Sequence, residues 1–469
     1  MKANRQCVVE IKKYSKKGVG QGSAVELQKT IEVRGAHPGE QLLVEILKRK
    51  KGNYQANVLE ILKEHPCRIS PRCQHAGVCG GCSYQSLSYE KQSYYKEEKL
   101  RDLFKDVIGE GEFFPMIAME DPWQFRNKME FSFYEDREQN KCLGLVMAGT
   151  KGRVLNLEEC HLVRPWMIKV LTRVRKWWEG TTVQAYHRLK NEGTLHTLTL
   201  REGMQTGEKL VMLTISGSPS GEFSHKELEA FKQAVLGELE GVVSLFLQIK
   251  HIQEGKPTQY NEMLLSGPDH IHEKLCITYP DGTQKTLVFK ISPSSFFQPN
   301  TFQAEKLFSR ALQMVTKKDR LIDILDLYCG TATLGIVFAS LAKKVIGIEL
   351  NPYAVYDAHV NTEANGISNV EVIQGDVKDI LKTEAVNTLK DIDLMIVDPP
   401  RVGLGPKTLK EVLSFLPKEI LYISCNPYTQ IEDVKECLLN GYFIKAIQPV
   451  DQFPHSAHVE NIVLLQRKN

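Results

Sequence analysis

The sequence predicts an α/β fold, with a parallel sheet in the C-terminal part of the chain, residues 291–469. Short apolar strands alternate there with helical segments, as in LIDILDLYC, TLGIVFASLA and KVIGIEL. This alternation favours a parallel sheet with helices on both faces. Acidic residues follow several of these strands, and parallel sheets bind ligands at the carboxyl ends of their strands. We therefore expect the principal ligand site in this part of the chain.

Residues 1–65 are predicted to form a small β-barrel. Four stretches with alternating apolar and polar residues, QCVVEIKKY, GSAVELQKTIEV, EQLLVEILKRKK and YQANVLEILKE, are separated by glycine-rich turns. This segment has 13 Lys/Arg and 7 Asp/Glu, although the whole chain has a net charge of only +3. A basic module favours contact with nucleic acid. A solvated basic surface would have the same composition, so both interpretations stay open.

Residues 66–290 are predicted to form a central α+β domain. LSYEKQSYYKEEKLRDLF has helical spacing, whereas FRNKMEFSFY, TLHTLTLRE, EKLVMLTISG and VVSLFLQIK have the alternation of strands. This region contains little else that points to its structure.

The composition is typical of a globular protein, with 42% hydrophobic and 25% charged residues. No stretch approaches the roughly 20 apolar residues that a membrane-spanning helix needs, and the N-terminus has no apolar core of signal-peptide length. We therefore expect a cytoplasmic location. Four of the eleven cysteines lie between Cys67 and Cys82, and such clustering in a long cytosolic chain indicates metal binding or catalysis rather than disulfides.

Acidic residues at three successive strand ends indicate a nucleoside-type cofactor. ILDLYCGTATLGI contains Asp326 and a glycine turn at Gly330, Glu349 ends the next strand, and Asp376 follows the third. An acidic residue at the end of the second strand can bind both ribose hydroxyls. The dinucleotide pattern G-x-G-x-x-G is absent, which argues against a pyrophosphate site. Together these features resemble the S-adenosylmethionine-dependent methyltransferase fold.

Two later strand ends indicate the chemistry. Asp398 ends a strand in DLMIVDPPRVGLG, where two prolines stiffen the following loop. Arg401 stands where enzymes that methylate exocyclic amines have an aromatic residue, which argues against that reaction. Cys425 follows the next strand in EILYISCNP. A lone cysteine is more often buried in a core, but the preceding Pro-Pro-Arg loop favours a nucleophile.

A candidate general base lies near the C-terminus, in DQFPHSAHVENIVLL. Glu460 precedes an apolar strand, and a carboxylate at the mouth of a buried pocket can have a raised pKa that suits proton transfer. His455 and His458 are competitors for this role. A residue at the surface edge of a strand is the structural alternative for Glu460.

The motifs DLYCG, DPPRVGL, SCNP and FPHSAHVE, in this order, resemble those of the RNA 5-methyluridine (uracil-C5) methyltransferase family, and SFFQPNT matches the segment before that family's cofactor fold. The resemblance implies a Rossmann-like methyltransferase fold over residues 291–469 and an OB-like, TRAM-type N-terminal barrel. It implies Cys425 as nucleophile and Glu460 as base. The resemblance implies S-adenosylmethionine contacts from Gln298, Tyr328, Thr333, Glu349, Asp376 and Asp398. Thr333 is a departure, because better-known members often have Asn there.

The implied chemistry explains the need for a thiol. Carbon 5 of uracil is too weakly nucleophilic to take a methyl group unaided. Addition of the Cys425 thiolate at C6 would make C5 an enolate carbon that attacks the methyl group. A base must then remove the C5 proton before the thiol can be eliminated.

Three cysteines with the spacing C-x5-C-x2-C, namely Cys73, Cys79 and Cys82, form a candidate metal site. The close pair suits zinc or iron–sulfur, although a structural zinc site usually has two such pairs. The resemblance implies a [4Fe–4S] cluster, which one branch of the family contains, with Cys160 as the fourth ligand. Cys67 is the alternative fourth ligand, and four free thiols are the structural alternative.

RNA is the partner that the resemblance implies. The favoured substrate is a uridine of 23S ribosomal RNA, in a loop or flipped out of a helix; the T-loop of transfer RNA is the alternative. An RNA-binding or assembly factor with an inactive methyltransferase fold is a third reading. Arg126 and Lys128 are candidate RNA contacts. Tyr14 and Tyr54 are candidates for base stacking, with partly buried barrel tyrosines as the favoured alternative.

Overall fold

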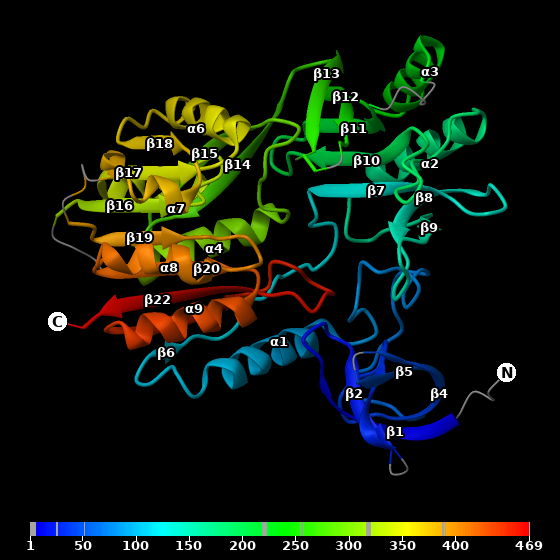
Figure 1. Ribbon diagram of the computed structural model, residues 1–469, viewed down its shortest axis with the longest axis horizontal. Helices are drawn as coiled ribbons and strands as arrows, with labels where there is room; N and C mark the ends of the chain where they lie inside the picture. Colours follow the sequence, from blue (N-terminus) through cyan, green and yellow to red (C-terminus); the bar gives the residue numbers. More distant parts are fainter. Residues whose placement is uncertain are drawn as a thin grey trace.

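The computed structural model shows three bodies, which are an N-terminal barrel, a central sheet and a large C-terminal sheet (Figure 1). It describes residues 6–24, 27–50, 52–217, 223–253, 255–256, 258–315, 320–386, 389 and 391–468.

The N-terminal barrel is closed and has five strands in the order β1-β2-β3-β5-β4. Its strands are β1 (Gln6–Tyr14), β2 (Gly20–Ala24), β3 (Leu27–Val33), β4 (Gln41–Lys50) and β5 (Asn53–Lys63). The stretch predicted as one strand, GSAVELQKTIEV, is in fact parts of two. The chain reverses direction inside it, because β2 and β3 pair antiparallel. Val9, Ile31 and Val44 fill the barrel interior, as the alternation predicted.

The central sheet has seven strands in the order β13-β12-β11-β10-β7-β8-β9. They are β7 (Lys128–Glu135), β8 (Lys141–Val146), β9 (Val154–Asn156), β10 (Leu195–Glu202), β11 (Lys209–Ser216), β12 (Val243–His251) and β13 (Gln259–Ser266). Helices α2 (Pro165–Glu179) and α3 (His225–Leu236) cover one face, where Val170 and Phe231 pack against Leu198 and Leu213. The strands predicted from sequence are β7, β10, β11 and β12.

The C-terminal sheet has the order β18-β17-β16-β19-β20-β22-β21-β6, with β16 to β20 parallel. Its strands are β6 (Glu112–Phe113), β16 (Ile322–Leu327), β17 (Ala342–Glu349), β18 (Val370–Gln374), β19 (Leu394–Val397), β20 (Glu419–Ser424), β21 (Tyr442–Val450) and β22 (Glu460–Arg467). The predicted Rossmann-like α/β sheet is therefore confirmed. Strand order reverses between β16 and β19, and open α/β sheets bind ligands in the crevice outside the carboxyl ends of the strands at such a point.

Helices cover both faces of this sheet (Figure 1). They are α4 (Thr301–Met314), α5 (Thr333–Phe338), α6 (Pro352–Ala364), α7 (Val377–Ile380), α8 (Gly405–Ser414) and α9 (Pro427–Leu439), with short 3-10 turns at Ala339–Leu341 and Glu384–Val386. A hairpin of β14 (Ile271–Thr278) and β15 (Gln284–Ile291) packs its Leu275 and Phe289 into the same core. Among the helices of the described residues, none has the length and apolar character needed to traverse a lipid bilayer.

Helix α1 (Tyr89–Phe104) connects the barrel side of the molecule to the C-terminal sheet, where it lies beside α9 (Figure 1). Its Lys96 ammonium contacts the Asp451 carboxylate at 2.7 Å, and both side chains are almost completely buried. Lys96 also donates to the carbonyl of Phe453, while the Tyr89 hydroxyl donates to Asp451. This ion pair therefore fixes the start of the loop 451–459, which leads into β22.

We predict that Lys96→Met strongly destabilises the protein, because it leaves the Asp451 carboxylate buried without its countercharge. Breaking one side of a buried ion pair costs about 3–5 kcal/mol, which would lower the urea midpoint of unfolding. The matched control is Lys105→Met, since Lys105 lies 3.9 Å from Asp102 with both side chains exposed; exposed pairs contribute about 0–1 kcal/mol. Equal midpoints for the two variants would contradict this role.

Candidate active site

The loop between β16 and α5 forms one wall of the crevice. Tyr328, Gly330 and Ala332 all have positive φ angles, of 62°, 56° and 58°. A Cβ built on Gly330 would meet no atom within 4 Å, so the turn borders open space. The backbone N–H of Gly330 donates to a carboxylate oxygen of Glu349 at 3.0 Å, and that of Asn351 donates to the other at 2.7 Å. The carboxylate at the end of β17 is thus held rigidly beside the loop.

Two carboxyl groups lie on either side of the topological switch point, of which Asp326 is buried and Asp398 is partly buried. Asp326, near the end of β16, is fully buried, and one of its oxygens accepts from Gly335 N–H at 3.0 Å. The other oxygen, Oδ1, has no hydrogen-bond partner among the described residues. Burial and then the Asp398 carboxylate raise the pKa of Asp326 to about 8. Burial raises the pKa of Asp398 to about 7. The switch point therefore has a carboxyl oxygen without a partner among the described residues, and a cation nearby would favour the ionised form of both groups.

Strand register brings Cys425 and Glu460 together. Ser424 of β20 pairs with Asn461 of the antiparallel β22, so the next residues along, Cys425 and Glu460, are neighbours. Burial and then the nearby Glu460 carboxylate raise the pKa of the Cys425 thiol, while a hydrogen bond from the Arg401 guanidinium lowers it. Burial and Asp398 raise the pKa of Glu460 well above its usual range, and Arg401 opposes them. Thiol, carboxyl and guanidinium thus form one interacting group.

The Arg401 loop is fixed to the strand that carries the thiol. Asn426 donates from its side-chain amide to the carbonyl of Arg401 at 2.8 Å, and Thr429 donates from its hydroxyl to the same oxygen at 3.3 Å. Asp433 accepts from the backbone N–H of Leu404 and from the Tyr422 hydroxyl. The Pro-Pro-Arg loop and the Cys425 strand end therefore keep a constant relative position.

Neither competing histidine is suited to be the base. His455 is buried, stacks on Trp123 with ring centroids 4.0 Å apart, and uses both ring nitrogens in contacts with Gln92 and with the carbonyl of Pro122. Burial and then the Lys96 ammonium lower the pKa of His455 to about 4. Burial and then Arg401 also lower the pKa of His458 to about 4. Both imidazoles are therefore poor proton acceptors at neutral pH.

The remaining predicted cofactor residues lie around the same sheet edge. Burial and then the nearby Asp376 carboxylate raise the pKa of Tyr328. Asp376 also caps α7 by accepting from Lys378 N–H at 3.0 Å. The Thr333 hydroxyl lies 3.1 Å from that of Thr331. Gln298 contacts the loop before β22, where its side-chain oxygen accepts from Gln452 at 3.3 Å.

Four of the five predicted ligand candidates line one cavity of about 340 Å³, namely Cys73, Cys79, Cys82 and Cys160. Burial is the main cause that raises the pKa of the Cys82 thiol to about 12 and that of Cys160 to about 11, and neighbouring thiols contribute. Donors already point at two sulfurs, because Gly81 N–H lies 3.4 Å from Cys79 Sγ and the Gln85 amide 3.2 Å from Cys82 Sγ.

Cys67, the fifth candidate, is not among the residues that line this cavity. Its backbone N–H donates to His65 Nδ1 at 2.9 Å instead. Within the described ranges, no three His, Cys, Asp or Glu side chains converge closely enough to hold a single metal ion.

Two residues that sequence reasoning did not assign belong to this site. Asp326 was interpreted only as a strand end, although its buried Oδ1 has no hydrogen-bond partner in the part of the chain that the structure describes and its pKa is raised. Arg401 was read as a departure from the amine-methylation motif, whereas it contacts the thiol and also lines the cysteine cavity. The position of Arg401 directly after paired prolines, 24 residues before Cys425, was the available signal. Tyr14, by contrast, is partly buried beside Tyr84, and its hydroxyl shares a hydrogen bond of 2.7 Å with His37 Nδ1, as the structural alternative predicted.

Known proteins resemble this chain over most of its length. A model of the tRNA (uracil-5-)-methyltransferase family matches residues 221–468. An uncharacterized RNA methyltransferase from Protochlamydia amoebophila is 44% identical over 441 residues, which are 93% of this chain and 99% of the relative. Another from Caldanaerobacter subterraneus is 34% identical over 464 residues, 98% of each chain.

A solved structure resembles the whole fold. The crystal structure of Pyrococcus abyssi tRNA (uracil-54, C5)-methyltransferase in complex with S-adenosyl-L-homocysteine has a TM-score of 0.73 and 25% sequence identity, and the match covers 98% of this chain and 99% of that one. The predicted family resemblance is thereby confirmed. The chain belongs to the tRNA (uracil-5-)-methyltransferase family and is an S-adenosylmethionine-dependent RNA uracil-5-methyltransferase.

Proposed function

We propose that this enzyme methylates C5 of a uridine in 23S ribosomal RNA through a covalent adduct between Cys425 and C6 of the base. The observation that carries the proposal is the interacting group of Cys425, Glu460 and Arg401 beside a crevice of acidic strand ends. The proposed reaction needs a thiolate that adds to the uracil ring and a base that later removes a proton, and a cation beside the thiol favours the thiolate. An inactive binding factor would not need to keep all three in contact.

Cys425 is the nucleophile in this proposal. Arg401 donates to the thiol and favours its ionised form, against burial and the Glu460 carboxylate. The thiolate attacks C6, the C5=C6 electron pair moves toward O4 through C5, and C5 becomes nucleophilic. S-adenosylmethionine supplies the methyl group that C5 takes.

Glu460 is the base that completes the reaction. Once C5 is methylated it still has its proton, and its removal lets the C6–sulfur bond break and restores the C5=C6 double bond. The buried environment raises the pKa of Glu460, and a carboxylate with a raised pKa is a stronger proton acceptor than an exposed one.

Six residues would hold the cofactor, which are Gln298, Tyr328, Thr333, Glu349, Asp376 and Asp398. The rigid carboxylate of Glu349 suits two ribose hydroxyls, because both its oxygens are fixed by backbone N–H groups. We add Asp326 to this set, since its free Oδ1 and raised pKa suit a cationic ligand. These residues fit the charge and polarity of S-adenosylmethionine.

Cys73, Cys79, Cys82 and Cys160 would hold a [4Fe–4S] cluster. Four thiols around one cavity, with N–H donors directed at two of the sulfurs, support this assignment. A four-iron cluster binds each thiolate at a different iron, so its ligands need not converge as they would on one ion. The cluster would link the cysteine segment, residues 73–82, to Cys160 in the segment before α2.

The choice of 23S ribosomal RNA follows from these cysteines, because cluster-bearing bacterial members of the family commonly act there. The T-loop of transfer RNA is the second candidate. It is favoured by the similarity to the Pyrococcus abyssi enzyme, whose described substrate is uracil 54 of tRNA.

We predict that anaerobically purified enzyme transfers label from S-adenosylmethionine to unmodified 23S RNA but not to a transfer RNA pool, as mapped by nuclease digestion and mass spectrometry. Cys425→Ala should lower this rate about a thousandfold or more, because the nucleophile is lost, and should leave cofactor binding unchanged by calorimetry. The control is Cys142→Ala, a thiol on β8. Label in transfer RNA alone would overturn the substrate, and loss of cofactor binding in Cys425→Ala would overturn the role.

We predict that Glu460→Gln accumulates a covalent protein–RNA adduct, because methyl transfer proceeds but the C5 proton stays. The adduct should appear as a slowly migrating band on a denaturing gel, labelled by the methyl group. The double variant Cys425→Ala/Glu460→Gln should give no such band. Normal turnover by Glu460→Gln would exclude Glu460 as the base.

We predict that Cys160→Ala loses the visible absorption and the bound iron of the anaerobic protein, whereas Cys67→Ala keeps both. The reason is that only Cys160 of this pair lines the cavity with the other three thiols. Iron content by chemical analysis and visible spectra are the measurements. Iron retained by Cys160→Ala and lost by Cys67→Ala would show that the ligand set is local to residues 67–82.

A further inference from the structure

A turn of the N-terminal barrel contacts the loop 451–459, which leads into β22. The turn consists of residues 15–19, between β1 and β2, and the barrel lies beside the start of α1 (Figure 1). Gly18 in this turn is buried. A Cβ built on Gly18 would overlap the Cβ of Ala457 and would lie 2.9 Å from the hydroxyl oxygen of Tyr84. The backbone of the barrel therefore lies directly against the loop.

This contact leaves no room for a side chain at position 18. Gly18 has a φ of 73°, in the left-handed region that favours glycine. Ala457 is 7% exposed, and its methyl group has no other rotamer into which it could move. A larger residue at position 18 must therefore displace backbone, either that of the turn or that of the loop.

The turn is fixed by hydrogen bonds of its own. Ser15 N–H donates to the carbonyl of Val19 at 2.8 Å, and Gly18 N–H donates to the carbonyl of Ser15 at 3.0 Å. The Ser15 hydroxyl accepts from Val19 N–H at 3.1 Å. Directly before the turn, the ring of Tyr14 packs on that of Tyr84 with centroids 4.8 Å apart. The turn therefore offers the loop a constant surface.

The same turn also reaches the segment that follows the thiol. The ammonium of Lys16 lies 4.5 Å from the ring centroid of Tyr428, which is in the first turn of α9 and three positions after Cys425. Lys99 of α1 lies 5.1 Å from the same centroid and donates to the carbonyl of Ala457 at 3.3 Å. The barrel turn and α1 together therefore contact the chain just after the proposed nucleophile and just before the proposed base.

We propose that the turn 15–19 is a positioning element for catalysis, which holds Ala457 and thereby sets where the Glu460 carboxyl group lies. Glu460 is three positions after Ala457 and is the first residue of β22 that pairs with a neighbouring strand. The place of the chain before it therefore depends on contacts of the loop. Gly18 touches no reacting group and acts only through this loop. The inference rests on the proposed role of Glu460 as the base.

The test compares Gly18→Ala with Gly35→Ala in the whole protein. The added carbon of Gly18→Ala should shift the loop and slow removal of the C5 proton. We expect kcat to fall about tenfold to a hundredfold, as a misplacement of about 1 Å can cause, with KM within about twofold. The covalent protein–RNA adduct should accumulate on a denaturing gel. Gly35 is the matched control because its φ is 67° and an added Cβ would meet no atom within 4 Å. Gly35→Ala therefore has similar backbone strain without the overlap, and it should change neither constant by more than about twofold.

A second substitution tests whether the contact itself is the cause. Gly18→Ala/Ala457→Gly removes the overlapped carbon, so its kcat should exceed that of Gly18→Ala by about threefold or more, as expected for two residues in contact. If Gly18→Ala does not fold, Ala457→Gly alone tests the same contact, because it removes the methyl group that Gly18 faces and adds no atom. It should lower kcat about threefold.

Hydrogen exchange of the protein without RNA reports on the loop independently of methylation. Gly18→Ala should speed exchange of the amides of residues 451–460 about tenfold relative to Gly35→Ala, and leave that of β16 to β20 unchanged. Equal exchange and equal kcat in these two variants would overturn the proposal, as would a fall in kcat without accumulation of the adduct. If the unaltered enzyme methylates no RNA while exchange still differs between the variants, the proposed function fails and the positioning of the loop stands.

Discussion

The pairing of β22 between β20 and β21 is the constraint on which the proposed chemistry depends. β22 runs antiparallel to β20, so the end of one strand meets the start of the other at the edge where ligands bind. Cys425 and Glu460 are 35 positions apart in sequence, yet a single register makes them neighbours. A slip of one residue would turn every side chain of β22 to the other face. Apolar residues are fully buried on both faces of β22, so the buried Asn461 distinguishes the register: its side-chain amide donates to Gln430, and the Gln430 amide donates to the Asn461 carbonyl.

Several carboxyl groups in one buried crevice are costly unless something offsets their charge. Asp326 and Asp398 have pKa values raised to about 8 and about 7, and Glu460 is raised as well. Since like charges in a low dielectric disfavour ionisation of one another, the Asp398 carboxylate raises the pKa of both Asp326 and Glu460. Arg401 is the protein's own cation among them, and it opposes the pKa shifts of both Cys425 and Glu460. The same residue therefore supports the thiolate and the carboxylate.

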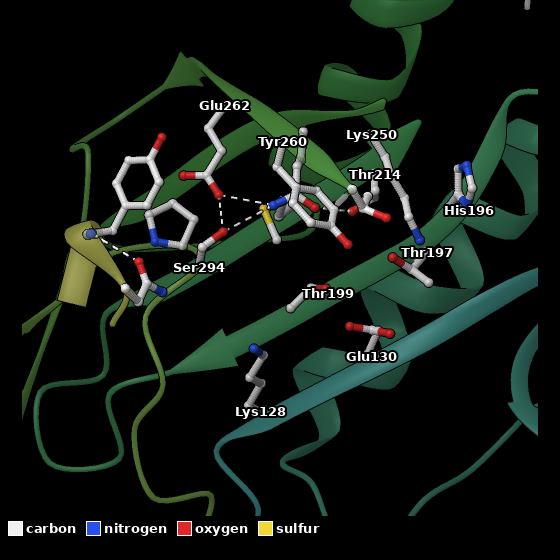
Figure 2. A pocket seen from close by; sticks show the side chains of 16 residues that line it. Lys128, Glu130, His196, Thr197, Thr199, Thr214, Lys250, Tyr260, Glu262 and Ser294 are labelled. Carbon is white, nitrogen blue, oxygen red and sulfur yellow. Dashed lines mark hydrogen bonds between the residues drawn. The ribbon is translucent and has the colours of Figure 1, made fainter. Parts of the chain in front are cut away.

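Sequence patterns predicted the parts of the molecule that local periodicity determines. Apolar strands followed by Asp or Glu predicted the edge of the C-terminal sheet, and the alternation in TLHTLTLRE predicted β10. They did not predict that the Thr side of β10 faces a groove (Figure 2), because the opposite wall comes from Ser294 and Asn351, distant in sequence. The two-residue strand β6 joins the C-terminal sheet through β21, and no two-residue pattern can indicate that. The sequence patterns did not predict a role for Arg401, because only tertiary contacts bring it to Cys425 and Glu460.

The cysteine segment and the loop that leads to Glu460 are held together by backbone hydrogen bonds. The carbonyl of His455 accepts from the N–H groups of Ser83 and Tyr84, directly after Cys82. His455 has a positive φ of 62° and is buried, a conformation that persists in a non-glycine residue only when its surroundings fix it. Those surroundings are the Trp123 ring, Gln92 of α1 and the cysteine segment itself. A cluster that makes residues 73–82 rigid would therefore also steady the loop before Glu460, without taking any part in electron transfer.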